Sequence, residues 1–197
     1  MSPIHTLTEL LARLPGLGPR QARRVVQYLL SRDQAYRDTL AKEIQALAAR
    51  TAQCTRCYRY ADATALGLCT TCADGERDQS TLMVVEHDVD IDAIEASLTY
   101  AGQYFVLGGL MNMVKQRKEK VIRFKELIRR VNTDVTEVIF ALATTPEGDF
   151  TAKELSSALS AGGYTGTVSL LGRGLSIGAE LEYADPETLR SALKNRG

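Results

Sequence analysis

Apolar residues recur at helical spacing in the first fifty residues of this chain. One stripe runs over residues 4–14 and a second over residues 22–29, so each predicts an amphipathic helix. Between them lies Leu14-Pro15-Gly16-Leu17-Gly18-Pro19, a turn made of helix breakers. Pro19 suits the first position of the second helix, because the N–H that proline lacks is not needed there. A third helix is predicted after Asp33, which is a good capping residue.

After residue 80 the pattern changes to short apolar runs that alternate with helical stretches. Strands are predicted at 82–85, 104–107, 138–142 and 167–171, and helices at 90–100, 113–131 and 151–161. Thr151 and Glu154 form a capping box that opens the last of these helices, and the polar residues 73–80 are interpreted as a linker or turn. This order implies a mainly parallel sheet flanked by helices, so the fold class is α/β with an N-terminal α-helical hairpin domain. Ligands of such sheets bind beyond the carboxyl ends of the strands. Glu86 follows the first strand and Glu147 and Asp149 follow the third, an arrangement suited to Mg²⁺.

All four cysteines of the chain lie in one short stretch between these two parts. Cys54 and Cys57 form one Cys-x-x-Cys pair, and Cys69 and Cys72 form a second. Two such pairs supply the four thiolates of a tetrahedral Zn²⁺ site, which has no open position and is therefore structural. A pair of disulfides or a redox Cys-x-x-Cys is the alternative, but a redox motif needs no second copy. We expect one structural zinc ion per chain.

Charge is distributed unevenly along a chain whose formal net charge is zero. Residues 11–37 hold six arginines and one acid, and residues 113–130 hold eight Lys and Arg and two Glu. Two basic patches on a neutral protein suit a polyanion bound on one face, although solvated helix faces would give the same pattern. The sequence contains no apolar run near the roughly 20 residues that span a bilayer, and we expect a cytoplasmic protein.

The glycines of the predicted hairpin indicate contact with nucleic acid. Gly16 and Gly18 allow the backbone to approach a phosphate, and the free N–H groups that begin the second helix point at the anion. Arg20, Arg23 and Arg24 would add charge-assisted bonds to neighbouring phosphates. Such contacts do not read bases, so binding would be non-specific and salt-sensitive. An ordinary helical hairpin also needs Gly and Pro in its turn, but the excess of arginine favours DNA.

The last part of the chain is rich in glycine and then acidic. Residues 172–178 contain three glycines but no following Lys-Ser/Thr, so they do not form a Walker A motif. Residues 180–185 resemble an acidic Walker B segment without its partner. A loop that leads to a final helix, with Asp185 as its cap and Pro186 at its first position, is the simpler interpretation.

Taken together, the order of these parts resembles the RecR family of bacterial recombination mediators. Helix–hairpin–helix, Cys₄ zinc site, Toprim-like α/β domain and glycine-rich C-terminal segment follow one another over nearly the whole chain. The matching segments are Leu14 to Pro19, the four cysteines, Val84-Val85-Glu86, Asp90 to Glu95, Tyr104 to Leu107, Pro146-Glu147-Gly148, Gly172 to Asp185 and Thr188-Leu189. The regions that follow are 1–53 (DNA-binding hairpin), 54–72 (zinc finger), 79–172 (Toprim domain) and 173–197 (C-terminal segment and helix).

The resemblance implies a function without catalysis. RecR-like proteins form a ring-shaped tetramer that encircles or clamps DNA. They act with RecO, and often RecF, to load RecA onto single-stranded DNA coated with single-strand-binding protein. In this family the acids of the Toprim domain are associated with contacts to RecO, which points to Glu86, Glu147 and Asp149 here.

The sequence also departs from these patterns at two places. Toprim enzymes carry Asp-x-Asp after the third strand, and Ala143 and Thr145 stand at the corresponding positions. A two-metal site would be poorly supplied with ligands, so a Mg²⁺-dependent nuclease or primase-like enzyme is the weaker alternative. Residues 111–118 are basic where the family usually has a Ser-Pro and glycine-rich loop, and we predict helix there. A scaffold that binds a basic partner but no DNA is a third hypothesis.

Overall fold

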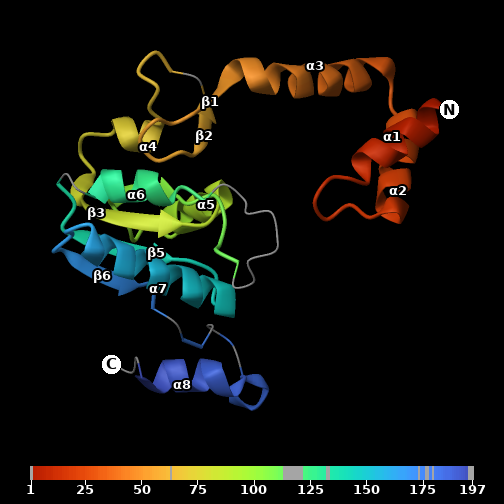
Figure 1. Cartoon of the computed structure of the whole chain (residues 1–197). Helices are drawn as coiled ribbons and strands as arrows, with labels where there is room; N and C mark the ends of the chain where they lie inside the picture. Colours follow the sequence, from red (N-terminus) through yellow and green to blue (C-terminus); the bar gives the residue numbers. More distant parts are fainter. Residues whose placement is uncertain are drawn as a thin grey trace. The chain divides into compact units, whose positions relative to one another are not determined.

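The computed structural model describes residues 2–62, 64–112, 122–131, 134–172, 174–175, 178 and 180–194 (Figure 1). The chain divides into two compact units, Met1–Thr51 and Ala52–Gly197. Within the described residues, every helix is too short or too polar to cross a lipid bilayer.

The first unit contains the three helices that the sequence predicts. Helix α1 spans Pro3–Leu11, α2 spans Pro19–Leu30 and α3 spans Gln34–Arg50. Pro19 begins α2 as expected. The Asp33 carboxylate caps α3, because its Oδ1 accepts a hydrogen bond from the Tyr36 N–H at 2.8 Å.

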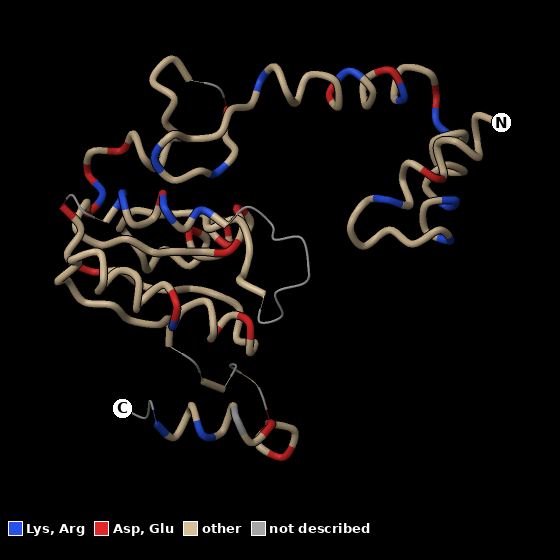
Figure 2. The backbone as a smooth tube through the Cα atoms, viewed as in Figure 1, with Lys and Arg blue, Asp and Glu red and all other residues tan. Residues whose placement is uncertain are grey.

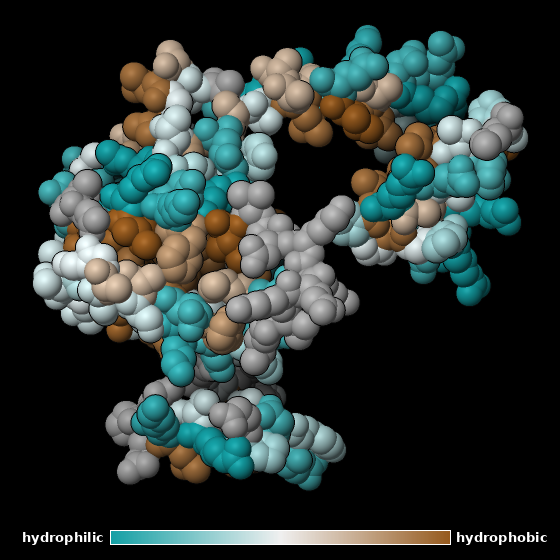
Figure 3. All heavy atoms as spheres, in the orientation of Figure 1, coloured by the Kyte–Doolittle hydropathy of each residue, from teal (hydrophilic) through white to brown (hydrophobic). Residues whose placement is uncertain are grey.

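Few side chains of this unit are buried. Ala22 and Val26 of α2 are the only fully buried positions among its described residues. On α3, Ile44 and Leu47 are each 60% exposed, and this apolar surface is visible along the helix in Figure 3. The periodicity therefore predicts these helices correctly, but most of their apolar side chains are not buried within the unit itself.

The second unit begins with the segment that carries the cysteines. Strands β1 (Thr51–Gln53) and β2 (Tyr60–Asp62) pair with each other, and the short helix α4 spans Thr70–Ala73. We call residues 54–72 the knuckle segment.

A four-stranded parallel sheet forms the rest of this unit, as predicted. Its strands are β3 (Asp78–Val85), β4 (Gly102–Val106), β5 (Glu137–Ala141) and β6 (Thr167–Leu170), in the order β4-β3-β5-β6. Every neighbouring pair of strands runs parallel. The helices between them are α5 (Asp88–Ala96), α6 (Phe124–Val131) and α7 (Pro146–Ala161). The α/β fold class, with a Toprim-like sheet, is confirmed.

Each face of the sheet carries its own apolar core. Leu82, Phe105 and Phe140 pack with Leu127 of α6 and Leu155 of α7 on one face. The opposite face is covered by α5, and its cluster is Met83, Val85, Ile91, Tyr104 and Val106. The sheet is thus a rigid support for the loops at its carboxyl edge and for the knuckle segment beside β4.

The knuckle segment is attached to the edge strand β4. The Val106 N–H donates to the Cys57 carbonyl at 2.8 Å. The Tyr58 ring meets the Phe105 ring edge to face, with centroids 5.4 Å apart. Tyr58 has a φ of 65°, in the left-handed region, so the turn after Cys57 holds an uncommon conformation. These contacts join the cysteine turn to the core of the sheet.

Two acids of α5 also bind the knuckle segment. Arg59 forms a salt bridge with Asp92 at 2.7 Å. The Asp88 Oδ2 accepts a hydrogen bond from the Tyr60 N–H at 2.8 Å. The two acids therefore link the knuckle segment to the helix that follows Glu86.

Helix α7 begins five residues earlier than the sequence analysis predicts. A capping box at Thr151 was expected to open this helix, but the N-cap is Thr145, whose Oγ1 accepts from the Gly148 N–H at 3.2 Å. A Cβ atom at Gly148 would lie 1.9 Å from the Ala143 carbonyl oxygen, so glycine is required there. Thr151 is fully buried inside α7, and its Oγ1 accepts from the Met111 N–H at 2.8 Å.

Two further boundaries differ from prediction. Strand β3 begins at Asp78, within the polar stretch that was interpreted as a linker; the Asp78 carboxylate accepts bonds from Ser80 and Thr81, which satisfies the polar strand start. Helix α6 begins at Phe124, whereas the predicted basic helix covers 113–131. Residues 113–121 lie outside the described residues, so the prediction for 111–118 is tested only at 111 and 112, which are not helical.

The C-terminal segment contains a single turn of 3₁₀ helix, η1 (Leu181–Tyr183), and helix α8 (Pro186–Lys194). The Asp185 Oδ1 accepts from the Thr188 N–H at 3.0 Å, so Asp185 caps α8 as predicted. For the described residues, the structure confirms the prediction that this stretch is a loop followed by a final helix.

A bidentate ion pair fixes α5 to the sheet and gives a pH-dependent prediction. Arg77 donates to Glu95 at 2.6 and 3.0 Å, and the Tyr104 hydroxyl donates to Glu95 at 2.6 Å. The hydrogen bond from Arg77 lowers the pKa of Glu95. Because the folded-state pKa lies below the unfolded value of about 4.3, this carboxylate stabilises the fold above pH 4.3 and loses that effect as pH falls through its folded pKa.

Glu95→Gln should therefore lower the free energy of unfolding at pH 7 by about 1–2 kcal/mol, a modest value because the carboxylate is partly exposed. Urea titrations at several pH values would measure it, with the exposed Glu76→Gln as control. The gap between wild type and variant should narrow as pH falls below about 4.3. An equal gap at pH 3 and pH 7 would show that the pair contributes no charge effect.

Candidate metal centre and nucleic-acid interface

The four cysteines meet in one buried cluster. Their exposed fractions are 4% or less, and their sulfur atoms all lie within 4.8 Å of one another. The helix α4 begins directly after Cys69 and carries Cys72, while the turn from Cys54 to Cys57 is closed by a hydrogen bond from the Tyr58 N–H to the Cys54 carbonyl at 2.9 Å. Two tight turns therefore aim two pairs of thiols at one point.

The distances fit a tetrahedral metal site and not a disulfide. The sulfurs of Cys57 and Cys69 are 3.6 Å apart, and all four cysteines are free. A disulfide needs about 2.05 Å. Four ligands at the Zn–S distance of about 2.3 Å stand about 3.8 Å from each other. The cluster thus matches the size of a metal tetrahedron.

The thiol cluster favours the ionised form that a metal binds at Cys69, whereas the pKa values of Cys57 and Cys72 are raised. The hydrogen bond from Cys57 is the main cause that holds the pKa of the Cys69 thiol far below its usual value, and the same bond raises the pKa of Cys57. A divalent cation would remove this conflict, because it stabilises all four thiolates. Four protein ligands leave no position for substrate, so the centre is suited to structure and not to catalysis.

The hairpin turn between α1 and α2 has the backbone geometry that an anion site needs. Gly16 has a φ of 77°, in the region that only glycine adopts readily. Gly18 is the N-cap of α2, and no side chain caps the first N–H groups of this helix. The first turn of α2 contains no acid. The positive end of the helix dipole therefore lies at backbone N–H groups that an anion can approach.

The three predicted arginines lie together on the surface of α2. Arg20, Arg23 and Arg24 are exposed, and they line a hollow of about 960 Å³ between α1 and α2. Figure 2 shows the basic residues of this helix. His5 and Glu9 of α1 border the same hollow and pair with each other at 3.4 Å. The structure thus brings the predicted DNA-binding residues to one side of the hairpin.

The acids predicted at the carboxyl edge of the sheet do not form a metal cluster. Among the described residues, only the four cysteines form a group of three or more potential ligands within 4.8 Å of one another. Glu86 follows β3 and is 18% exposed, whereas Glu147 and Asp149 lie in the exposed first turn of α7. The described geometry therefore does not support a Mg²⁺ site made of these three acids.

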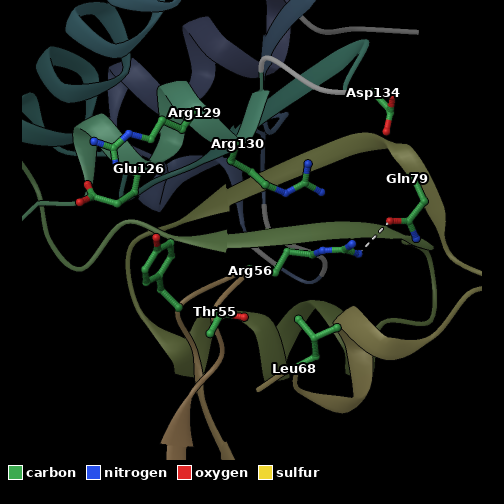
Figure 4. A pocket seen from close by; sticks show the side chains of 9 residues that line it. Thr55, Arg56, Leu68, Gln79, Glu126, Arg129, Arg130 and Asp134 are labelled. Carbon is green, nitrogen blue, oxygen red and sulfur yellow. Dashed lines mark hydrogen bonds between the residues drawn. The ribbon is translucent and has the colours of Figure 1, made fainter. Parts of the chain in front are cut away.

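Sequence reasoning missed a second basic site, which involves the knuckle segment and α6. Arg56, Arg129 and Arg130 line a pocket of about 450 Å³ (Figure 4). Burial, and then the nearby charge of Arg56, lowers the pKa of Arg130. Arg56 and the pair on α6 are more than seventy positions apart in sequence, so only the fold brings them together. The basic composition of residues 113–130 was the one available signal.

Comparison with known families covers most of the chain. The family model described as "RecR, helix-hairpin-helix" matches residues 4–48, that described as "Toprim domain" matches residues 80–170, and that described as "RecR, C-terminal" matches residues 174–196. The first match includes the hairpin glycines and arginines, and the second includes the parallel sheet.

Relatives over the full length carry one name. A "Recombination protein RecR" from Chloroflexus aggregans is 39% identical over 99% of this chain and 93% of its own length. Proteins of the same name from Cereibacter sphaeroides and a Roseiflexus species are 38% and 40% identical, and each alignment covers at least 98% of this chain and 93% of the relative. The helical hairpin, the cysteine cluster and the parallel sheet are thus parts of one known arrangement, and the chain belongs to the RecR family of recombination proteins.

Proposed function

We propose that this chain is a non-enzymatic, DNA-binding mediator of recombinational repair, which acts with RecO and in many cases RecF to load RecA on single-stranded DNA. The observation that carries the proposal is the hairpin of a RecR-family chain, where an uncapped helix start stands beside three exposed arginines. That surface suits phosphate groups, and phosphate contacts do not distinguish one base from another.

In the DNA complex the backbone at Gly16 and Gly18 approaches one phosphate, and Arg20, Arg23 and Arg24 bind its neighbours. Guanidinium groups suit this role because they donate two parallel hydrogen bonds to phosphate oxygens. Binding is non-specific and weakens as salt rises.

The metal of the cysteine cluster is one structural Zn²⁺ per chain, held by Cys54, Cys57, Cys69 and Cys72. Four thiolates in a closed tetrahedron are the ligand set that zinc prefers. Zinc fixes the two cysteine turns, and through the Cys57 carbonyl it stabilises the edge of β4.

The remaining assignments follow from the family. Residues 1–53 are the DNA-binding region, 54–72 the zinc finger, 79–172 the Toprim domain and 173–197 the C-terminal segment. Glu86, Glu147 and Asp149 bind RecO, and four chains assemble into a ring in the cytoplasm. Two of the three acids are exposed, which suits contact with a basic partner surface.

The competing proposal is a Mg²⁺-dependent Toprim nuclease or primase-like enzyme. It lacks support because Ala143 and Thr145 provide no carboxylate and the Thr145 hydroxyl caps α7. No observation in the described residues favours it over the mediator.

A loading assay tests the mediator function directly. RecA filament formation on single-stranded DNA coated with single-strand-binding protein would be followed by RecA ATP hydrolysis, with RecO present and this chain added or omitted. Filament formation should become several-fold faster when the chain is added. An unchanged rate with correctly folded, zinc-loaded protein, or DNA cleavage by the chain itself, would contradict the proposal.

A further inference from the structure

The pocket of about 450 Å³ beside the knuckle segment combines cations from two different places in the fold with a neutral amide from a third. Arg56 lies between the first two cysteines, Arg129 and Arg130 lie in the last turn of α6, and Gln79 lies on β3. Figure 4 shows the side chains of Arg56 and Arg130 extending toward the same side of the pocket. The space between them is open, and its volume suits a nucleotide-sized group.

Arg56 is held in place by neutral partners. Its Nη1 donates to the Cys72 carbonyl at 3.3 Å and to the Gln79 Oε1 at 3.2 Å. Gln79 is itself oriented, because its Nε2 donates to the Arg77 carbonyl at 3.0 Å. Neither partner carries a charge, and Arg56 forms no salt bridge with any residue that the structure describes. The guanidinium is therefore preorganised while its charge is available to a ligand.

The acids of the pocket lie at its two ends. In Figure 4, Glu126 lies beside Arg129 at one end and Asp134 lies at the other. Bringing Arg56 and Arg130 together in a partly buried place costs free energy, which an anion between them would offset. Part of the positive charge is balanced by Asp134, whose charge partly opposes the lowering of the Arg130 pKa by burial. The metal centre balances a further part, because four thiolates around Zn²⁺ leave two net negative charges. The arginines thus have two possible roles, which an experiment can separate.

We propose that this pocket binds a backbone phosphate of single-stranded nucleic acid. Paired guanidinium groups match phosphate oxygens, and the ring of Tyr58 and the side chain of Leu68 supply apolar wall beside them. Cations next to aromatic surface are the combination that single strands bind. The proposal rests on the DNA-binding function proposed above and adds a contact on the second unit, separate from the hairpin arginines of the first.

The test is a salt series with labelled oligo(dT). Arg56→Gln with Arg130→Gln should lower affinity on the order of tenfold at 0.1 M salt, and should reduce the slope of log affinity against log salt by about 1.4, which is about 0.7 for each of two lost phosphate contacts. Lys125→Gln with Lys153→Gln, a loss of two charges at exposed positions outside the pocket, is the matched control and should change affinity less than twofold. The single change Arg129→Gln, at an exposed position, gives a smaller decrease if the double variant does not fold.

Further outcomes decide whether the arginines bind nucleic acid or only balance the charge of the metal centre. If Arg56→Gln with Arg130→Gln loses zinc and keeps the wild-type salt slope, the arginines only balance the metal centre and the proposal is wrong. The proposal would also be wrong if free dTMP competed for binding as well as unlabelled oligo(dT) does at the same concentration of phosphate groups. If the pocket variants keep full affinity while Arg20→Glu with Arg24→Glu loses it, only this inference fails; the reverse result would remove the hairpin from the proposed function and leave the pocket.

Discussion

Replacing Cys57 by Ser should empty the metal site and loosen the edge of the sheet. Zinc content is expected to fall from about one ion per chain to near zero, because a structural tetrahedral site depends on all four thiolates. The free energy that stabilises the folded knuckle segment should fall by about 5 kcal/mol or more. This is part of the roughly 10–16 kcal/mol that zinc binding supplies in small zinc-binding peptides. The apolar cluster of the knuckle segment is limited to its own cysteines, Ala61 and Leu68, so without the metal the segment keeps only its contacts with the sheet and with α5.

The sheet should survive this change, because its two apolar clusters contain no cysteine. Hydrogen exchange is the sharpest measurement. The Val106 amide donates to the Cys57 carbonyl and should lose protection, whereas amides of the central strand β3 should keep theirs. A zinc chelator should reproduce the pattern in wild-type protein, and the exposed Thr70→Ser on α4 should leave it unchanged. A Cys57→Ser protein with full zinc content and a protected Val106 would refute the assignment of this ligand.

The metal site could be predicted from sequence because its ligands are local. Each cysteine pair lies on one tight turn, and the spacing of the two pairs already restricts the chemistry. The parallel sheet could be predicted for a similar reason, since buried strands and amphipathic helices each have a period that is visible within one segment. Element boundaries were less accessible. Thr151 has the sequence of a helix start, yet the chain enters α7 at Pro146 because Thr145 is a competing cap.

Sites that depend on the fold were harder to predict. The expectation that Glu86, Glu147 and Asp149 converge followed from strands β3 and β5, which do end side by side. Glu147 and Asp149, however, lie in the first turn of α7 and not at the end of β5, and the three acids do not form a cluster. Conversely, the sequence gives no hint that Arg56 of a cysteine turn would meet Arg130 of a later helix. Long-range placement of charged side chains is decided by packing, which local periodicity does not encode.

Reversing the charge of two hairpin arginines should give the second large effect, a loss of affinity for DNA. Arg20→Glu with Arg24→Glu should weaken binding to a single-stranded oligonucleotide by about 100-fold or more at 0.1 M salt, because each reversal removes a phosphate contact and adds repulsion. Both side chains are exposed on α2, so the helix content and thermal stability should change little. Fluorescence anisotropy across a salt series would measure the affinity, and circular dichroism would check the fold.

The matched control makes the same change of net charge at other positions of the chain. Lys42→Glu with Lys153→Glu changes the net charge equally, at exposed positions of α3 and α7 that lie outside the hollow of the hairpin. If only total charge mattered, the two double variants would lose affinity alike. If the uncapped start of α2 and its arginines form the DNA site, the control should lose at most a few-fold, and its salt slope should stay that of wild type. Equal losses in both variants would therefore remove the hairpin from its proposed role, even in a chain of the RecR family.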